Sequence, residues 1–483
     1  MLNVRRRFRR RLAVTAVFLS LALGVWYIAL PPDSHVRLAL GFNSARLFNY
    51  LRAAATNRDA WLWKPARHRL ELRSDVGYLI KTGYGTRHRV PEQLEAFAES
   101  GGVLGDEGRG FLVVGDWTTV NETDAKLLGV EVHDAIKMVM ETKMDNKHEE
   151  HQRFTKYRSL QGTVAAGDEE RARRLGQTYG WELDALKFIM GMEFAYKRMP
   201  HKKWYIILDD DTYLVKPSLE LLLSHLDPAE PHYIGNAVGD YKGRFAHGGS
   251  AVLLSGEAMK VLFSRPDVVA RAYVESLDET WGDRLVATTL QKVGIYMDER
   301  YCHYFNGEAP EMTRIRKDRV CSPVVSFHGL REPGAMVAVG RALARVEKPV
   351  LWGQLWEVFG RQPMEAYAEK PFRPGDHVGP RDEQTKTWTG VGSDDECRKR
   401  CEGGGGGWCL AWAYDAGASA CHGAPWMIVG EETGDGVVSG INWEKAEPLM
   451  RRCLSSYGEA VRGDMRRHGQ RETARRGTTR HAV

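Results

Sequence analysis

Short apolar runs alternate with amphipathic segments over residues 76–255. The runs are rich in β-branched and aromatic residues and end in glycine or polar residues, which is typical of buried β-strands. Between them, apolar residues recur at helical spacing, most clearly from Trp181 to Arg198, where Pro200 follows the last turn. The pattern predicts strands at 76–82, 111–114, 204–208, 233–234 and 251–255, and helices at 91–97, 181–198 and 217–226.

Alternating strands and helices of this size predict an α/β domain, with a mostly parallel sheet between two helical layers, over residues 73–340. The stretch 134–174 is charged and weakly patterned, and we expect loop and helix there. A linker rich in Arg, Glu and Pro is predicted at 341–375, followed by a compact cysteine-bearing domain at 376–447.

The N-terminal region has the pattern of a membrane anchor. Residues 12–30 contain no charged residue, and their 19 positions approach the ~20 that a helix needs to cross a bilayer. Six Arg in residues 5–11 place the tail 1–11 in the cytoplasm and residues 31–483 in the lumen. A cleaved signal peptide is the alternative, but the run is long for one and no clear cleavage site follows. The sequence therefore predicts a signal anchor at 12–30 and a stem at 31–72.

Charge is unevenly distributed along the chain. The net charge is +5, but residues 5–11 and 451–483 contribute +6 each, which leaves about −7 for residues 12–450. This balance does not support a basic nucleic-acid-binding face on the folded part. The end of the chain, 448–483, is polar and Arg-rich, and we predict that it is a disordered tail.

The cysteines support a secretory-pathway protein. All seven lie on the predicted lumenal side, where disulfides persist. The single glycosylation sequon, at Asn121, lies on the same side. Cys397 and Cys401 are four apart on a predicted helix and project from one face, and Cys409 and Cys421 are possible partners. Their pairing stays open, and zinc binding is a less favoured alternative because the spacing is uneven. One thiol remains unpaired if Cys302 and Cys321 join.

Three consecutive carboxylates, Asp209, Asp210 and Asp211, follow the apolar run at 204–208. Open α/β sheets bind ligands beyond the carboxyl ends of their strands, and adjacent carboxylates repel each other unless a cation or solvent is close. Hard oxygen ligands suit Mg²⁺ or Mn²⁺, so a metal site is predicted, with a solvated acidic turn as the alternative. The Asp-x-Asp-x-Thr/Val pattern of haloacid-dehalogenase-like phosphatases does not fit, because the fifth position is Tyr213.

Three more motifs follow in order: His247-Gly248-Gly249-Ser250, Trp281-Gly282-Asp283-Arg284 and Val325-Ser326-Phe327-His328. The glycine pair permits close approach of a ligand to the backbone, although a simple turn before a strand is the alternative. With the acidic run, this order resembles the Fringe-like and core 1 β1,3-galactosyltransferase group, glycosyltransferase family 31, particularly its fungal members, over roughly residues 76–335. Residues 376–447 are similar to PAN/Apple domains.

The resemblance implies a type II Golgi membrane enzyme with a GT-A fold, a UDP-sugar donor and Mn²⁺ or Mg²⁺. By position, Asp211 and His328 are the implied metal ligands, and Asp209 and Asp210 would hold the ribose, the sugar or metal-bound water. Asp283 falls at the position of the catalytic base. The sequence departs from the pattern here, since many relatives have two adjacent acids, and Glu279 is the second candidate for the base.

Further contacts to the donor are expected from earlier strand ends. Thr82 and Asp116 are candidates for nucleotide contacts, although either residue would also suit a turn cap. Gly248 and Gly249 are candidates for close approach to the donor.

The sequence therefore predicts an inverting, metal-dependent transferase that moves a hexose from a UDP-sugar to a glycan or glycoprotein, forming a β1,3 linkage. The alternative is a membrane-anchored protein that binds carbohydrate or protein through its PAN/Apple-like domain and has lost catalysis. An intact set of acidic and histidine residues favours the enzyme.

Overall fold

The computed structural model describes residues 2–54, 58–100, 102–119, 129–241, 243–360, 364–370, 372–403, 408–430 and 436–453. For residues 2–13, 16, 53, 54 and 146 only the backbone is described. The predicted sequon at Asn121 and the predicted tail beyond residue 453 lie outside the described residues.

A six-stranded sheet forms the core of the larger lobe, in the order β3-β2-β1-β4-β9-β6. The first four strands are parallel, whereas β9 runs antiparallel to both β4 and β6. The predicted mixed α/β class is confirmed, and β3 is an additional strand at the edge of the stretch for which only loop and helix were expected. The strands are β1 (Val76–Lys81), β2 (Phe111–Gly115), β3 (Val132–Asp134), β4 (Trp204–Asp209), β6 (Tyr233–Gly235) and β9 (Val252–Ser255).

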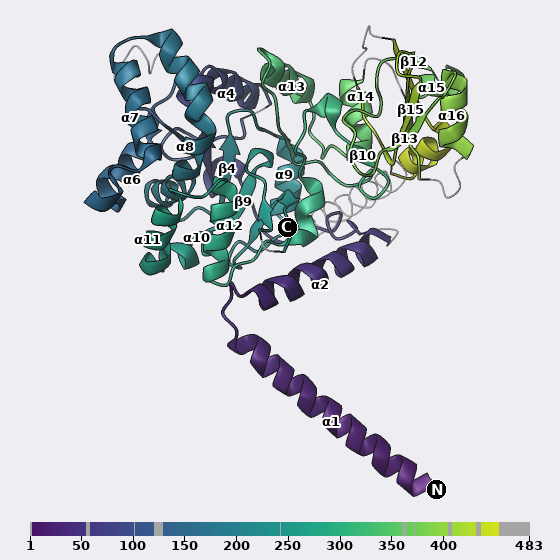
Figure 1. Cartoon of the computed structure of the whole chain (residues 1–483), viewed down its shortest axis with the longest axis horizontal. Coiled ribbons are helices and arrows are strands. Elements are labelled where there is room, and N and C mark those ends of the chain that lie inside the picture. The colour runs from purple at the N-terminus through teal and green to yellow at the C-terminus, as the bar shows by residue number, and fades with distance from the viewer. Residues whose placement is uncertain are drawn as a thin grey trace, which may run out of the picture.

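The long helix α8 (Glu169–Arg198) covers one face of this sheet. Alternate residues of a strand face the same side of the sheet. In β1, the side chains of Leu79 and Lys81 face α8. A Cβ at Gly191 of α8 would lie 2.9 Å from Leu79, so helix and strand are in close contact. Figure 1 shows β4 and β9 between α8 on one side and α9 (Lys216–Leu223) on the other, as expected for three layers.

The predicted helices are present, with α8 extending further towards the N-terminus than its apolar pattern indicated. Asp168 caps α8 by accepting a hydrogen bond from the Arg171 N–H. The other helices of the lobe are α3 (Leu72–Asp75), α4 (Arg89–Glu99), α6 (Ala135–Lys143), α7 (Gln152–Ala165), α10 (Gly256–Phe263), α11 (Pro266–Glu275), α12 (Gly282–Lys292) and α13 (Ala335–Leu343).

A smaller lobe follows, built on an antiparallel sheet in the order β12-β17-β14-β15-β13 and labelled at the right of Figure 1. Helix α16 (Asp394–Gly403) packs on β14. Four half-cystines, Val391 and Trp412 make up its own buried core. The strands are β12 (Arg373–Pro374), β13 (Lys386–Thr389), β14 (Ala411–Asp415), β15 (Ala420–Ala424) and β17 (Val437–Ile441).

The two lobes share one hydrophobic core. Strand β10 (Ile315–Arg316) of the larger lobe pairs with β16 (Trp426–Met427) of the smaller one, and both Ile315 and Trp426 are fully buried. The segment predicted as a linker, 341–375, contains α14 (Leu355–Phe359) and α15 (Ala366–Glu369) and buries Trp352 and Trp356. It therefore packs against the lobes.

Three disulfides join Cys397 to Cys421, Cys401 to Cys409, and Cys321 to Cys453. The first two pairs use the four cysteines of the smaller lobe, so the alternative of zinc binding is wrong. A bond between Cys302 and Cys321 does not form. Cys321 reaches Cys453 across 132 residues instead, and Cys302 is the free thiol.

The chain begins with two helices, α1 (Leu2–Ala29) and α2 (His35–Ala54). In Figure 1, α1 extends away from the folded body, and α2 lies along it. The predicted anchor at 12–30 includes residues 12, 13 and 16, whose side chains lie outside the described residues. Within the part of the chain that is described, no helix combines the length and the hydropathy of a membrane span. The transmembrane prediction is therefore not confirmed.

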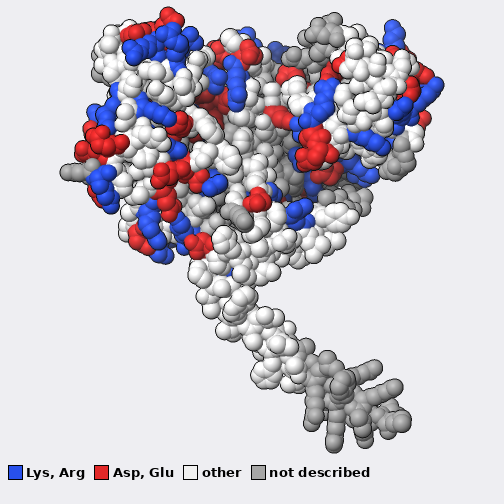
Figure 2. Space-filling model, in the orientation of Figure 1, with Lys and Arg blue, Asp and Glu red and all other residues white. Residues whose placement is uncertain are grey.

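Figure 2 shows acidic and basic side chains interspersed over the visible face of both lobes, and a white surface on the described part of α1. Residues 14–29 of that helix contain no Lys, Arg, Asp or Glu.

We expect the double substitution Cys397→Ser and Cys421→Ser to destabilise the smaller lobe by about 2–4 kcal/mol, because the bond closes a 24-residue separation inside a small core. Faster hydrogen exchange of β14 and β15 in the full chain would report this loss. Cys302→Ser is the matched control, since its thiol forms no disulfide. Equal exchange in the two variants would contradict the prediction.

Candidate active site

A two-stranded ladder brings the acidic run and His328 together. After β4, the chain turns through Asp209, Asp210 and Asp211 into β5 (Tyr213–Leu214), which pairs antiparallel with β11 (Ser326–Phe327). The Leu330 N–H also donates to the Asp211 carbonyl. As a result, His328 Nε2 lies 3.2 Å from Asp211 Oδ1.

These residues form a candidate metal centre. One ligand atom each from Asp209, Asp211 and His328 lies within 4.8 Å of the others. The Nδ1 atom of His328 is 3.3 Å from the Gly307 carbonyl, which can only accept a hydrogen bond. That contact favours a proton on Nδ1, as is usual for a ligating histidine. Burial acts to lower the pKa of His328, but the hydrogen bond to Asp211 and the charge of Asp211 outweigh it and raise that pKa, so Nε2 donates to Asp211 and would give up this proton to a bound metal. Two carboxylates and one imidazole suit Mn²⁺ well, so the donor set fits the predicted ion.

The paired glycines support this centre by leaving space for side chains. A Cβ at Gly249 would lie 2.2 Å from His328 Nε2, and the Gly249 carbonyl accepts a hydrogen bond of 2.7 Å from Thr212 Oγ1. On the other side, the Gly248 N–H donates to Asp283 Oδ2 at 2.8 Å. The groups that approach this pair closely are the imidazole and a carboxylate of this chain. Donor contacts by the two glycines stay a prediction.

Asp283 lies in the first turn of α12, next to the metal centre across the glycine pair. Burial raises the pKa of its carboxyl to about 6, although the hydrogen bond from the Gly248 N–H and the positive charge of Lys81 act in the opposite direction. The missing second acid has a steric reason, because a Cβ at Gly282 would lie 2.2 Å from the ring of Phe188. Helix α8 thus leaves no room for a side chain there.

The second candidate for the base, Glu279, is held elsewhere. Its Oε1 accepts a hydrogen bond from the Thr280 N–H at 2.9 Å and lies 3.3 Å from Arg284 Nε. The Glu279 carboxylate is thus engaged by a cation of the protein, whereas Asp283 lies beside the candidate metal centre. Asp283 therefore fits the role of the base better.

The protein itself supplies cations to the acidic run. Lys81 Nζ lies 2.8 Å from Asp209 Oδ1, and Arg331 Nε donates to Asp211 Oδ2 at 2.9 Å. Arg89 lies 3.3 Å from Asp210 Oδ1. Charge repulsion was one reason to predict a cation at this run, and these side chains relieve part of it.

The carboxyls of the run differ in acidity. Burial and the charge of Asp211 raise the pKa of Asp210 to about 6. Burial also acts to raise the pKa of Asp211, but the hydrogen bonds and charges of His328 and Arg331 outweigh it and hold that pKa well below its usual range. Of these two adjacent carboxyls, Asp211 is therefore held ionised, whereas Asp210 is more readily protonated.

The two predicted nucleotide contacts have partners within the protein. Thr82 Oγ1 donates to Asp210 Oδ2 at 2.7 Å, and Thr86 donates to the same oxygen. Asp116 is fully buried, accepts a hydrogen bond of 2.8 Å from the Tyr84 N–H, and lies 3.2 Å from Lys187 Nζ. Both residues therefore shape the turn after β1, and their direct contact with a nucleotide stays a prediction.

Sequence reasoning assigned no site role to Lys81, Thr86, Arg89 or Arg331. A lysine inside an apolar strand pattern is unusual, so the sequence alone could have indicated a special role for Lys81. In the structure it pairs in register with Asp209 and also contacts Asp184 at 2.9 Å. Arg331 lies three residues beyond His328, and nothing in its local pattern distinguishes it from other surface arginines.

Fold and site define an α/β protein with a candidate metal centre at the carboxyl end of a parallel strand, and a buried carboxylate beside it. Residues 133–280 match the model of a family described as Fringe-like, which indicates a glycosyltransferase. The matched segment includes the acidic run and the glycine pair but ends before Asp283 and His328. The case for those two residues therefore rests on their geometry and on the motif order.

We expect Gly249→Ala to lower the affinity for Mn²⁺ at least about tenfold, because the added methyl group would occupy the place of the His328 imidazole. The backbone at Gly249 has no positive φ, so alanine introduces no backbone strain. Isothermal titration with Mn²⁺ measures the effect. Gly243→Ala is the control, since its Cβ would meet only Arg284 at 3.5 Å. Unchanged affinity in Gly249→Ala would argue against His328 as a ligand.

Proposed function

We propose that this chain is an inverting, metal-dependent glycosyltransferase with a GT-A fold. It transfers a hexose from a UDP-sugar to a hydroxyl group of a glycan or glycoprotein and forms a β1,3 linkage. The observation that carries the proposal is the convergence of Asp209, Asp211 and His328 beside the buried carboxylate of Asp283, across the glycine pair Gly248 and Gly249.

Asp211, His328 and Asp209 would hold Mn²⁺ or Mg²⁺, and such an ion supplies positive charge for the departing diphosphate. Arg331 and Lys81, which lie on these carboxylates, keep their oxygens oriented and add further positive charge to the same end of the sheet. Thr82 and Thr86 hold Asp210 at the turn after β1, where the nucleotide would lie. Asp116 supports that turn through the Tyr84 N–H.

Asp283 acts as the general base. Its carboxylate accepts the proton of the acceptor hydroxyl group while the hydroxyl oxygen forms a bond to the anomeric carbon. The bond from that carbon to the diphosphate oxygen breaks on the opposite side, and its electron pair leaves with UDP. A single displacement inverts the configuration at the anomeric carbon and requires only this one positioned base.

The three disulfides suit an oxidising compartment, and we assign the enzyme to the Golgi lumen. The smaller lobe, which is similar in sequence pattern to PAN/Apple domains, would bind carbohydrate or protein.

A second candidate is a binding protein without catalysis. Lys81, Arg89 and Arg331 give the acidic run protein cations of its own, so the site does not depend on a metal for charge balance. This observation favours a site that has become purely structural.

UDP-sugar hydrolysis separates the two functions. We expect the full chain to release UDP from at least one member of a UDP-sugar panel with Mn²⁺, and to stop when EDTA removes the ion. Hydrolysis without EDTA sensitivity would rule out the metal-dependent mechanism. If the chain hydrolyses no donor of the panel and does not bind UDP, the binding protein is favoured.

We expect Asp283→Asn to keep UDP binding and to lose turnover by about 10²–10⁴-fold, since the amide cannot accept the proton. Because the pKa of Asp283 is raised to about 6, the carboxyl is protonated and inactive below that pH, and turnover by the unmodified enzyme rises with pH through this region. Steady-state rates between pH 5 and 8 measure both effects. Glu279→Gln should keep the turnover and the pH profile, and a loss of turnover there would move the base to Glu279.

A further inference from the structure

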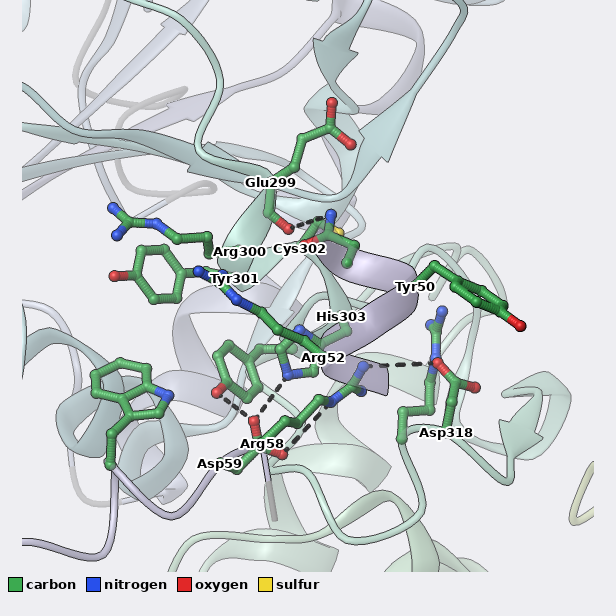
Figure 3. Close-up of a pocket in the computed structure, with 14 residues that line it drawn as sticks. Tyr50, Arg52, Arg58, Asp59, Glu299, Arg300, Tyr301, Cys302, His303 and Asp318 are labelled. Atoms are coloured by element: carbon green, nitrogen blue, oxygen red, sulfur yellow. Dashed lines mark hydrogen bonds and ion pairs between the residues drawn. The ribbon is translucent and has the colours of Figure 1, made fainter. Parts of the chain in front are cut away.

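A cavity of about 570 Å³ lies apart from the candidate active site, between the end of α2 and the 3₁₀ helix η4 (Glu299–Tyr304). Figure 3 shows residues of α2, the segment after it, η4 and the turn at Asp318 converging on this space. The volume is in the range of pockets that hold small ligands. None of its lining residues belongs to the metal centre or to the glycine pair.

The floor of the cavity is organised by the buried carboxylate of Asp59. It accepts hydrogen bonds from Tyr304 Oη and Ser322 Oγ, both at 2.6 Å, and lies 3.0 Å from His303 Nε2. Burial acts to raise the pKa of Asp59, but these hydrogen bonds outweigh it and lower that pKa, so the group stays ionised. Three segments far apart in sequence are thereby fixed before any ligand enters.

Arginine side chains with unused hydrogen-bonding capacity line the wall. The Nε of Arg319 is buried and has no hydrogen-bond partner, and among the described residues no carboxylate lies within ion-pair distance of its guanidinium group. The guanidinium of Arg58, in contrast, donates to Ser322 Oγ at 3.3 Å and lies 3.8 Å from Asp318 and 3.9 Å from Asp59. An arginine without a carboxylate partner keeps its charge available for an anionic ligand.

Most charges of the wall have partners within the protein. Glu299 is paired with Arg244 at 2.6 Å, Arg300 makes two contacts with Asp298, and Arg58 lies within 4 Å of both Asp59 and Asp318. Arg52 and Arg319 are the lining arginines without an ion pair among the described residues, and they favour an anionic group such as a carboxylate or sulfate.

Aromatic rings occupy the opposite side. The rings of Trp61 and Tyr301 lie 5.4 Å apart and are tilted by 51°. Such rings offer apolar faces to the C–H side of a sugar ring, and the Asn49 amide and Asp318 carboxylate supply partners for hydroxyl groups. A ligand that combines an anionic group with a sugar ring uses both halves of the cavity.

We propose that this cavity binds an anionic saccharide, with the carboxylate or sulfate on Arg319 and the sugar ring against Trp61 and Tyr301. The site is separate from the proposed transfer reaction and does not depend on it.

Isothermal titration calorimetry on the full chain tests the proposal, with EDTA present and no UDP-sugar, so that the metal centre is silent. The probes are a methyl glucuronide, the matching methyl glucoside and inorganic sulfate. We expect the glucuronide to bind more tightly than either other probe, and Arg319→Gln to weaken it about tenfold or more. Tyr301→Ala should weaken the glucuronide and leave sulfate unchanged.

Two variants control for folding. Arg319 packs over the Trp352 ring at 5.0 Å, so its loss alone could disturb the wall; Arg319→Lys keeps the charge and should retain most of the affinity. Arg316→Gln removes a similar side chain that packs over Trp426 outside the cavity and should have no effect. The proposal is wrong if the glucuronide does not bind, if it binds Arg319→Gln as it binds the unmodified chain, or if glucoside or sulfate binds equally well.

Discussion

The pairing of Tyr213 with Phe327 is the contact on which the candidate active site depends. It joins the end of β4 to a segment more than a hundred residues further along the chain and places His328 against Asp211. Gly249 then has to stay without a side chain, because the imidazole fills the place of its Cβ. Asp283 depends on the same loop through the Gly248 N–H. One short ladder thus fixes the relative positions of the proposed metal ligands and the proposed base.

Charge balance is the second constraint. Three consecutive carboxylates at a buried strand end would repel one another and lose hydration, and the fold offsets this with one cation for each: Lys81, Arg89 and Arg331. These cations come from β1, α4 and the segment after β11. An ion bound by Asp209, Asp211 and His328 would therefore enter a preorganised and partly neutralised site, where its charge remains available for the leaving diphosphate.

The smaller lobe is part of the same folded unit. The β10–β16 ladder, the buried tryptophans of the 341–375 segment and the Cys321–Cys453 bond all join it to the larger lobe. The proposed saccharide cavity lies close to this junction in sequence, since Arg319 and Ser322 flank Cys321. The fold thus places two chemically different candidate sites on one folded unit, one built on carboxylates and imidazole and the other on guanidinium and aromatic groups.

The sequence by itself determined the features that arise from local periodicity and residue type: the strands β1, β2, β4, β6 and β9, the helix that became α8, and an acidic run at a strand end. The tertiary structure alone decided that β9 runs antiparallel to its neighbours β4 and β6, that Cys321 pairs with Cys453, and that Lys81, Arg89 and Arg331 balance the acidic run. It also decided that position 282 has no room for a side chain, because Phe188 fills the space. The reason is that hydrophobic period reports which face of a segment is buried, whereas strand direction, pairing and charge balance depend on which distant segment covers that face.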